Sequence, residues 1–260
     1  MQYLGDGWAV NFSRHSAGMR DMSIRDAFGN GSGGISITAV DELVESLSFK
    51  RVIIYGFTAG TGLNLFAEND KGIAYASFYE LRVRHCKIGI HIKTEDQGFV
   101  NSNSFNRSII SGGVYDKAIF LQGCNNNEFL GQVIEPYETN SAHIYVEKGQ
   151  FVARGIRIEG ASQPADRPLL YFSPGTSESI VDGTYAGGLI MDKGDNDLKL
   201  SSSNSINTRN PGTNIIKNSA LLGIQGQEVP NWQFSHNNFR LEILNPEDVD
   251  DHRVIKLYIP

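Results

Sequence analysis

The sequence predicts an all-β fold, a parallel β-helix in which short strands wind into coils that stack along one axis. Three observations support this prediction. Phe recurs at a fixed place in successive segments, a second alternating strand follows each of these segments, and the composition combines 28 Gly and many Asn and Ser with only 8 Pro. Gly and Asn accept positive φ at little cost, so this composition suits many short strands joined by tight turns.

The first strand of each predicted coil carries a marker Phe and, five positions later, a β-branched residue. The markers are Phe49, Phe78, Phe105, Phe129 and Phe151, which lie 29, 27, 24 and 22 residues apart, and the β-branched residues are Ile54, Val83, Ile110, Ile134 and Ile156. An earlier copy begins at Met19. A single segment of this length cannot bury its own apolar face, but stacked copies share one core. We therefore expect an aromatic stack and an aliphatic stack inside the coils.

The second strand of each coil alternates apolar and polar residues over a few positions, which is the signal of a half-buried strand. The candidates are Ile35 to Thr38, Gly62 to Phe66, Ile88 to Lys93, Ala118 to Gln122, Ala142 to Glu147 and Pro168 to Phe172. A β-sandwich is the alternative, but it should show Asn-Gly hairpin signals, and these connections are longer and irregular. Helical patterns are scarce, and the best helix candidate is Thr38 to Ser48.

The register becomes harder to follow after Gly160. Further strands are expected at Ser179 to Val181, Gly188 to Met191, Leu198 to Leu200, Trp232 to Phe234, Phe239 to Leu244 and Val254 to Ile259. A serine-rich run near residues 201–205 marks a boundary, so we expect a β-helix over residues 1–205. An open β-helix end exposes unpaired strand edges, and residues 206–260 are expected to form a C-terminal β cap, an accessory β-domain or a trimerisation segment.

Charge and cysteine content exclude several classes of function. The net charge of −6 argues against a nucleic-acid partner, because no basic stripe is present to bind phosphates. Cys86 and Cys124 are too few for a disulfide framework and lack metal-ligand spacing. The chain has no run of 18 apolar residues and no basic, apolar start, so neither membrane insertion nor a signal peptide is expected. It begins in what already reads as folded sequence, which is consistent with a piece of a longer protein.

Residues in the same register of successive coils should form columns on the outer surface. Two positions after the marker come Asp21, Arg51, Glu80 and Arg107, whose alternating charges are typical of a stabilising ladder rather than of a site. Two positions before the marker come Asn103 and Asn127, which we expect to stack as an Asn ladder at a corner.

Two further columns combine arginines, aromatic residues and carboxylates. Six positions after the marker come Arg25, Tyr55, Arg84, Ser111, Glu135 and Arg157, and eight positions after it come Ala27, Phe57, Cys86, Gly113, Tyr137 and Glu159. Aromatic faces stack on pyranose rings and arginine binds carboxylates bidentately, so this mixture suits a sugar-binding strip.

The strip contains a candidate catalytic pair, Glu135 and Glu159. This register sets them one coil and two residues apart, roughly 8 Å on a flat sheet, which falls in the window of about 6.5 to 9.5 Å for inverting glycosidases. The candidate substrate-binding residues are Tyr55, Arg84, Tyr137 and Arg157. The alternative is that the glutamates only solubilise the surface. No trio of histidines has metal spacing, so we expect no metal site and no cofactor.

Several sequence segments resemble those of a known protein family. Gly89 to Ile92, Ala118 to Leu121 and Gly155 to Gly160, with irregular coils of 20 to 30 residues, resemble the pectate-lyase-like right-handed parallel β-helices, most of all phage tailspike and tail-fibre depolymerases. The resemblance covers roughly residues 10–200. It implies a homotrimer on the virion tail or outside the cell, whose acidic residues cleave a bacterial surface polysaccharide, either capsule or O-antigen, as a hydrolase or a lyase. A non-catalytic glycan-binding or structural spike segment is the alternative.

Overall fold

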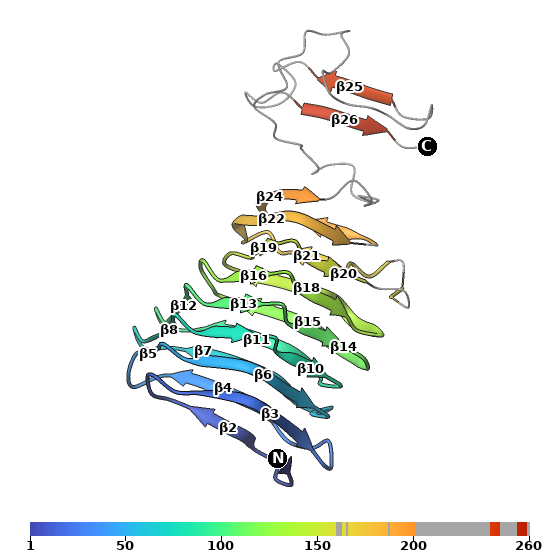
Figure 1. Ribbon diagram of the computed structural model, residues 1–260. Helices are drawn as coiled ribbons and strands as arrows, with labels where there is room; N and C mark the ends of the chain where they lie inside the picture. The colour runs from blue at the N-terminus through green and yellow to red at the C-terminus, as the bar shows by residue number, and fades with distance from the viewer. Residues whose placement is uncertain (160–162, 165, 187, 201–239, 245–253, 259–260) are drawn as a thin grey trace. The chain divides into compact units, whose positions relative to one another are not determined.

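The computed structural model describes residues 1–159, 163–164, 166–186, 188–200, 240–244 and 254–258. It confirms the predicted fold class, because the described residues up to Leu200 form a parallel β-solenoid of about 7 turns, and no helix is present among the described residues (Figure 1). The chain divides into two compact units, Met1–Thr208 and Arg209–Pro260. In the described part, no helix is long and apolar enough to cross a membrane.

Sheet A carries the marker residues. Its strands are β1 (Gln2–Tyr3), β3 (Gly18–Asp26), β6 (Ser48–Tyr55), β9 (Ser77–Tyr79), β10 (Arg82–Arg84), β13 (Ser104–Asn106), β14 (Ile109–Ser111), β16 (Glu128–Leu130), β17 (Val133–Glu135), β19 (Val152–Arg154), β20 (Arg157–Ile158), β22 (Ser177–Ala186) and β24 (Asp195–Leu200). From β9 to β20 each coil contributes two short strands, because a residue with positive φ, such as Glu80 or Arg107, bends the chain between them.

Sheet B contains the predicted second strands. It consists of β2 (Trp8–Phe12), β4 (Gly33–Ala39), β7 (Thr61–Ala67), β11 (Ile88–Thr94), β15 (Val114–Gln122), β18 (Glu138–Lys148), β21 (Leu170–Phe172) and β23 (Ile190–Asp192). Sheet C is smaller and consists of β5 (Val44–Glu45), β8 (Gly72–Ala74) and β12 (Phe99–Asn101). The helix predicted at Thr38 to Ser48 is wrong, because this segment ends β4, contains β5 and begins β6. Val44 and Leu47 are buried in the shared core, which holds the segment in the coil.

The core contains the predicted aromatic stack. Phe49, Phe78, Phe105 and Phe129 are fully or almost fully buried, and their ring centroids lie 4.9, 4.5 and 4.6 Å apart in succession. The rings are within 7° of parallel, because each residue is the register partner of the one in the next coil. Ile54, Val83, Ile110 and Ile134 form the aliphatic stack in the same way.

The predicted register is wrong by two residues in the coil that contains Phe151. Phe129 pairs with Ala153, and Ile134 pairs with Ile158 rather than with Ile156. Phe151 is buried all the same, and its ring lies 5.1 Å from that of Phe129 at 46°. The large side chain of Phe151, two positions before the marker position, thus occupies the space that the small Ala153 leaves at the marker position. Every outer residue of this coil consequently moves to a different column.

The predicted Asn ladder is confirmed. Asn103 and Asn127 are buried, and Asn103 Nδ2 donates to Asn127 Oδ1 at 2.8 Å. The same oxygen accepts the Asn103 backbone N–H at 3.0 Å, and Asn103 Oδ1 accepts that of Ala76 at 2.8 Å. Each side chain satisfies backbone groups of a neighbouring coil that would otherwise be buried without a partner. Phe151 follows Asn127 in this column, which interrupts the ladder.

The charged column two positions after the marker lies at the surface, but among the described side chains only its first two members form an ion pair of the predicted ladder. Asp21 and Arg51 form an ion pair through two hydrogen bonds, and both side chains are about half exposed. This contact lowers the pKa of Asp21. Asp21, Arg51, Glu80 and Arg107 all have φ between 50° and 55°, so the column follows the bend within sheet A.

The strands expected after residue 170 are present in part. Ser179 to Val181 lies within β22, Leu198 to Leu200 within β24, and Gly188 to Met191 overlaps β23. In the second unit, β25 (Arg240–Leu244) and β26 (Val254–Tyr258) pair in antiparallel fashion. The serine-rich run and the strand expected at Trp232 to Phe234 lie outside the described residues. Cys86 and Cys124 are free, and burial raises the pKa of each thiol to about 12.

Candidate functional site

The two candidate glutamates lie in one column on the outer face of sheet A. Val133 and Ile134 pair with Arg157 and Ile158, and the Glu159 N–H donates to the Ile134 carbonyl at 2.9 Å. Continuing this register by one residue places Glu159 beside Glu135. The predicted offset of two residues is therefore wrong, because it rested on Phe151 as the marker. Adjacent parallel strands lie about 4.8 Å apart, so the two backbones are one strand spacing apart.

Arg157 lies beside the pair, but in a different column from the one predicted. It is the register partner of Val133, and its guanidinium forms an ion pair with the Glu159 carboxylate. The Arg157 side chain is 62% exposed and that of Glu159 is 35% exposed, so the carboxylate stays accessible while it is held. This contact fixes Glu159 at the surface without burying it.

The column eight positions after the marker does not form a continuous outer strip. Phe57 and Cys86 are buried in the core, whereas Tyr137 is 62% exposed. The chain bends after position six, which turns this position inward in the lower coils. Tyr137 follows β17 at the corner near Glu135, and its N–H donates to the Gly113 carbonyl at 3.0 Å. Tyr137 thus remains next to the pair, while the lower members of its predicted column do not contribute.

Tyr55 and Arg84 belong to the same column as Glu135. Tyr55 pairs with Arg84, Arg84 with Ser111, and Ser111 with Glu135. Tyr55 therefore lies three coils from Glu135, roughly 14 Å at the usual strand spacing. The Arg25 guanidinium lies 5.1 Å from the centre of the Tyr55 ring. The structure thus arranges these candidate residues along the solenoid axis rather than around one point.

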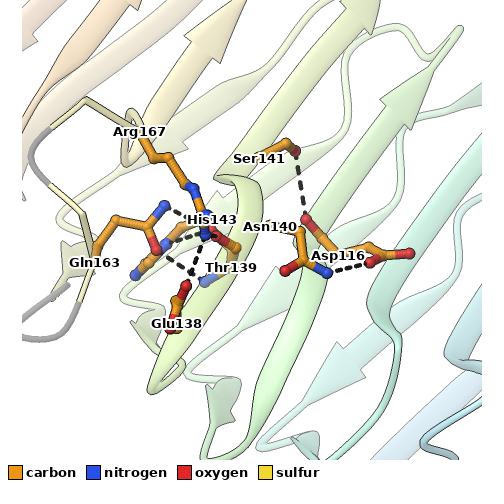
Figure 2. A network of polar contacts seen from close by, with 8 residues as sticks. All are labelled: Asp116, Glu138, Thr139, Asn140, Ser141, His143, Gln163 and Arg167. Carbon is orange, nitrogen blue, oxygen red and sulfur yellow. Dashed lines mark hydrogen bonds and ion pairs between the residues drawn. The ribbon is translucent and has the colours of Figure 1, made fainter.

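A network of polar contacts holds Gln163 and Arg167, which follow Glu159 in the chain, against the start of β18 (Figure 2). Arg167 forms an ion pair with Glu138 at 2.7 Å and donates to the Thr139 carbonyl at 3.0 Å. Gln163 accepts the Thr139 N–H at 2.8 Å and donates to Thr139 Oγ1 at 2.9 Å. The start of β18 is thereby tied to residues that lie beyond Glu159 in the chain.

The same network continues on its other side to the coil below (Figure 2). Asn140 Nδ2 donates to Asp116 Oδ1 at 2.6 Å, and Lys87 forms an ion pair with Asp116 at 3.7 Å. These contacts join β15 and β18 at the point where their register shifts. The shift leaves Asn140 and Ser141 opposite Asp116 of β15. The Ser141 hydroxyl donates to the Asp116 backbone carbonyl at 3.4 Å, whereas Asn140 bonds the Asp116 carboxylate.

His143 is fully buried at the centre of this network. Its Nε2 lies 3.0 Å from the Glu159 carbonyl oxygen, which can only accept, so Nε2 carries the proton. Its Nδ1 lies 3.1 Å from Thr139 Oγ1, which then donates to it. Burial lowers the pKa of His143 to about 4, so the ring is neutral at physiological pH. His143 thereby holds the backbone of Glu159 in place.

We predict that His143 makes folding dependent on pH. The pKa falls from 6.5 in the unfolded chain to about 4 in the folded one, so the unfolded chain binds more protons between these values. The contribution is fully present above pH 6.5 and is lost as the pH falls toward 4, on the order of 3 kcal/mol. Urea unfolding from pH 7.5 to pH 4.5 should show a shallower loss of stability for His143→Gln than for the wild type. The exposed His15→Gln should follow the wild type, and equal slopes for all three proteins would contradict this prediction.

Two sets of residues escape sequence reasoning. Glu138 begins β18, but Gln163 and Arg167 lie between strands and outside the repeat, so no pattern identifies the three as members of one network. The outward aromatic residues of sheet B did leave a signal. They are the central residues of Ile90-His91-Ile92, Ile119-Phe120-Leu121, Ile144-Tyr145-Val146 and Leu170-Tyr171-Phe172. Alternation places each central residue outside, so aligning the second strands as well as the first would have found this column.

The described residues contain no cluster of three or more His, Cys, Asp or Glu side chains that could hold a metal ion. No protein-family model, curated protein or solved structure matches this chain.

Proposed function

We propose that this chain binds and degrades a bacterial surface polysaccharide, as phage tailspike depolymerases do. A β-solenoid is consistent with glycan-binding and glycan-degrading proteins. The observation that supports degradation of the polysaccharide is the placement of Glu135 and Glu159 in one outer column, one coil apart. Two accessible carboxylates on a rigid sheet are the groups that glycoside hydrolysis requires.

The separation of the pair favours the retaining mechanism. Retaining glycosidases hold their carboxyl groups about 5 to 5.5 Å apart. The backbones of Glu135 and Glu159 are one strand spacing apart, about 4.8 Å, and parallel side chains keep that separation. The Glu159 carboxylate attacks the anomeric carbon, and the glycosidic oxygen leaves with a proton from Glu135. Glu135 then takes a proton from water, whose oxygen attacks the same carbon and releases Glu159. Glu159 is assigned as the nucleophile because Arg157 holds its carboxylate in an ion pair, whereas Glu135 has no ion pair among the described side chains.

Four residues are proposed to bind the substrate. Tyr137 and Arg157 lie near the pair, whereas Arg84 and Tyr55 lie two and three coils away along the same column. A polysaccharide that follows the axis would contact all of them in turn. Its pyranose rings would stack on the tyrosines, and any carboxylate substituents would bind the arginines bidentately.

The test is incubation of the chain with capsular and O-antigen polysaccharides from a panel of bacterial hosts. Reducing ends report cleavage of any kind, and the absorbance of unsaturated uronates reports elimination. New reducing ends without unsaturated uronates are expected, because the carboxylate pair supports hydrolysis. Failure to cleave any polysaccharide of the panel would favour the alternative, a non-catalytic glycan-binding or structural segment.

The proposal includes assembly as a homotrimer on a virion tail or outside the cell. This assembly follows from the resemblance to tailspike depolymerases. Sedimentation equilibrium measures the oligomeric state directly, and a mass of three chains is expected.

A further inference from the structure

A second outer column, on sheet B, has the properties of a binding surface. It consists of His91, Phe120, Tyr145 and Tyr171, which we call the aromatic column, on the successive strands β11, β15, β18 and β21 (Figure 1). Consecutive ring centroids lie 5.0, 5.6 and 4.7 Å apart. All four side chains are partly exposed, whereas their neighbours in sequence, such as Ile119 and Ile144, are fully buried. The column therefore belongs to the surface and not to the core.

Two lysines lie over this column. Lys117 Nζ is 4.4 Å from the centre of the Phe120 ring and 5.3 Å from that of Tyr145, and Lys193 Nζ is 5.6 Å from that of Tyr171. Among the described side chains, neither lysine forms an ion pair. Lys93, by contrast, lies over the Phe66 ring but is paired with Glu95 at 2.6 Å. The aromatic column thus holds two ammonium groups that have no carboxylate at ion-pair distance among the described side chains.

Hydrogen-bonding groups border the aromatic column. Gln122 connects the His91 ring, at 2.8 Å, to the Glu147 carboxylate, at 3.1 Å. Burial lowers the pKa of His91, so the ring is a neutral hydrogen-bonding group at physiological pH. Aromatic rings, amides and ammonium groups together complement a ligand that has apolar ring faces, hydroxyl edges and negative charge.

We propose that the aromatic column is a second binding surface, distinct from the carboxylate pair, for an acidic polysaccharide that lies along the solenoid axis. The groups repeat at the strand spacing of about 4.8 Å over four coils, which suits an extended, repeating ligand better than a compact one. The unpaired ammonium groups of Lys117 and Lys193 select carboxylate-bearing sugars. This inference deepens the proposed function by naming the substrate class, because such a surface would hold a long chain while the pair on sheet A cleaves it.

The test measures binding of four acidic polysaccharides, polygalacturonate, alginate, hyaluronate and polysialate, and of their carboxyl-reduced forms. At least one acidic form is expected to bind, and its reduced form to bind at least tenfold more weakly. K117Q/K193Q should weaken binding of the acidic form by about tenfold, because both ammonium groups are lost. Both side chains are at the surface, so the fold should stay intact. K50Q/K71Q is the matched control, because it removes the same charge and Lys50 also lies over a tyrosine ring, on sheet A.

The outcomes separate this inference from the proposed function. Cleavage of short oligosaccharides should be unchanged in K117Q/K193Q, and polysaccharide binding should be unchanged in E135Q/E159Q. Binding that survives in K117Q/K193Q, equal binding of reduced forms, or no binding of any acidic form would overturn the inference. If no polysaccharide is cleaved but K117Q/K193Q weakens binding of an acidic form, the aromatic column stays supported. If oligosaccharides are cleaved but K117Q/K193Q leaves binding unchanged, the carboxylate pair stays supported.

Discussion

Replacing Glu159 or Glu135 by Gln is expected to lower polysaccharide cleavage by about 10²- to 10⁴-fold. Glu159→Gln removes the proposed nucleophile, and Glu135→Gln removes the group that protonates the leaving oxygen. Both changes preserve side-chain size and lie on the exposed face, so the solenoid should fold normally. The initial rate of reducing-end formation measures the effect at saturating polysaccharide.

Glu128→Gln is the matched control for this experiment. Glu128 lies on the same sheet and in the same coil as Glu135, but it pairs with Ser104 and Val152 in a different column. Its substitution should leave the rate unchanged. Equal rates for the wild type and for both Glu135→Gln and Glu159→Gln would refute the assignment of this pair.

Truncating Phe105 to Ala is expected to destabilise the solenoid by about 3 to 5 kcal/mol. Its ring is fully buried and lies between those of Phe78 and Phe129, at 4.5 and 4.6 Å. The register pairing of three successive coils limits collapse around the cavity, which keeps the cost high. Urea unfolding followed by circular dichroism measures the change in the free energy of unfolding.

Phe28→Ala is the control for the core. Phe28 is 71% exposed, so this substitution removes the same atoms from the surface. Its cost should be under about 1 kcal/mol. If Phe105→Ala were no more destabilising than Phe28→Ala, the aromatic stack would not be a stabilising element of the fold.

The parts of the fold that repeat in the sequence could be predicted from it. Four marker residues and the Asn ladder follow a register that stays constant while each coil carries the same type of residue at the same place. The predicted register failed at Phe151, because this coil has Phe151 and Ala153 where the preceding coil has Asn127 and Phe129. Both positions face the core, so alternation alone cannot distinguish the two alignments. Predicting that Phe129 pairs with Ala153 would require knowing how side chains fill the space between the coils.

The candidate site was predictable to a similar degree. Its residue types were visible from the columns, but the distance between the glutamates depended on the one coil whose register had slipped. His143 could not be identified as a buried group, because its partners are a backbone carbonyl of Glu159 and the side chain of Thr139. Such contacts depend on the path of the chain at the corner and leave no spacing in the sequence.

The central claim is the register that places Glu159 beside Glu135, and an engineered disulfide tests it most directly. Register partners are about 4.8 Å apart, within the range of about 4.4 to 6.8 Å that a disulfide spans, whereas residues offset by one coil and two positions are roughly 8 Å apart. Oxidation of E135C/E159C followed by mass spectrometry of the proteolytic fragments should show one disulfide between these positions, with the buried Cys86 and Cys124 still reduced. E135C/R157C should remain reduced. A disulfide in E135C/R157C and none in E135C/E159C would show that Arg157, not Glu159, lies beside Glu135, and would contradict the account.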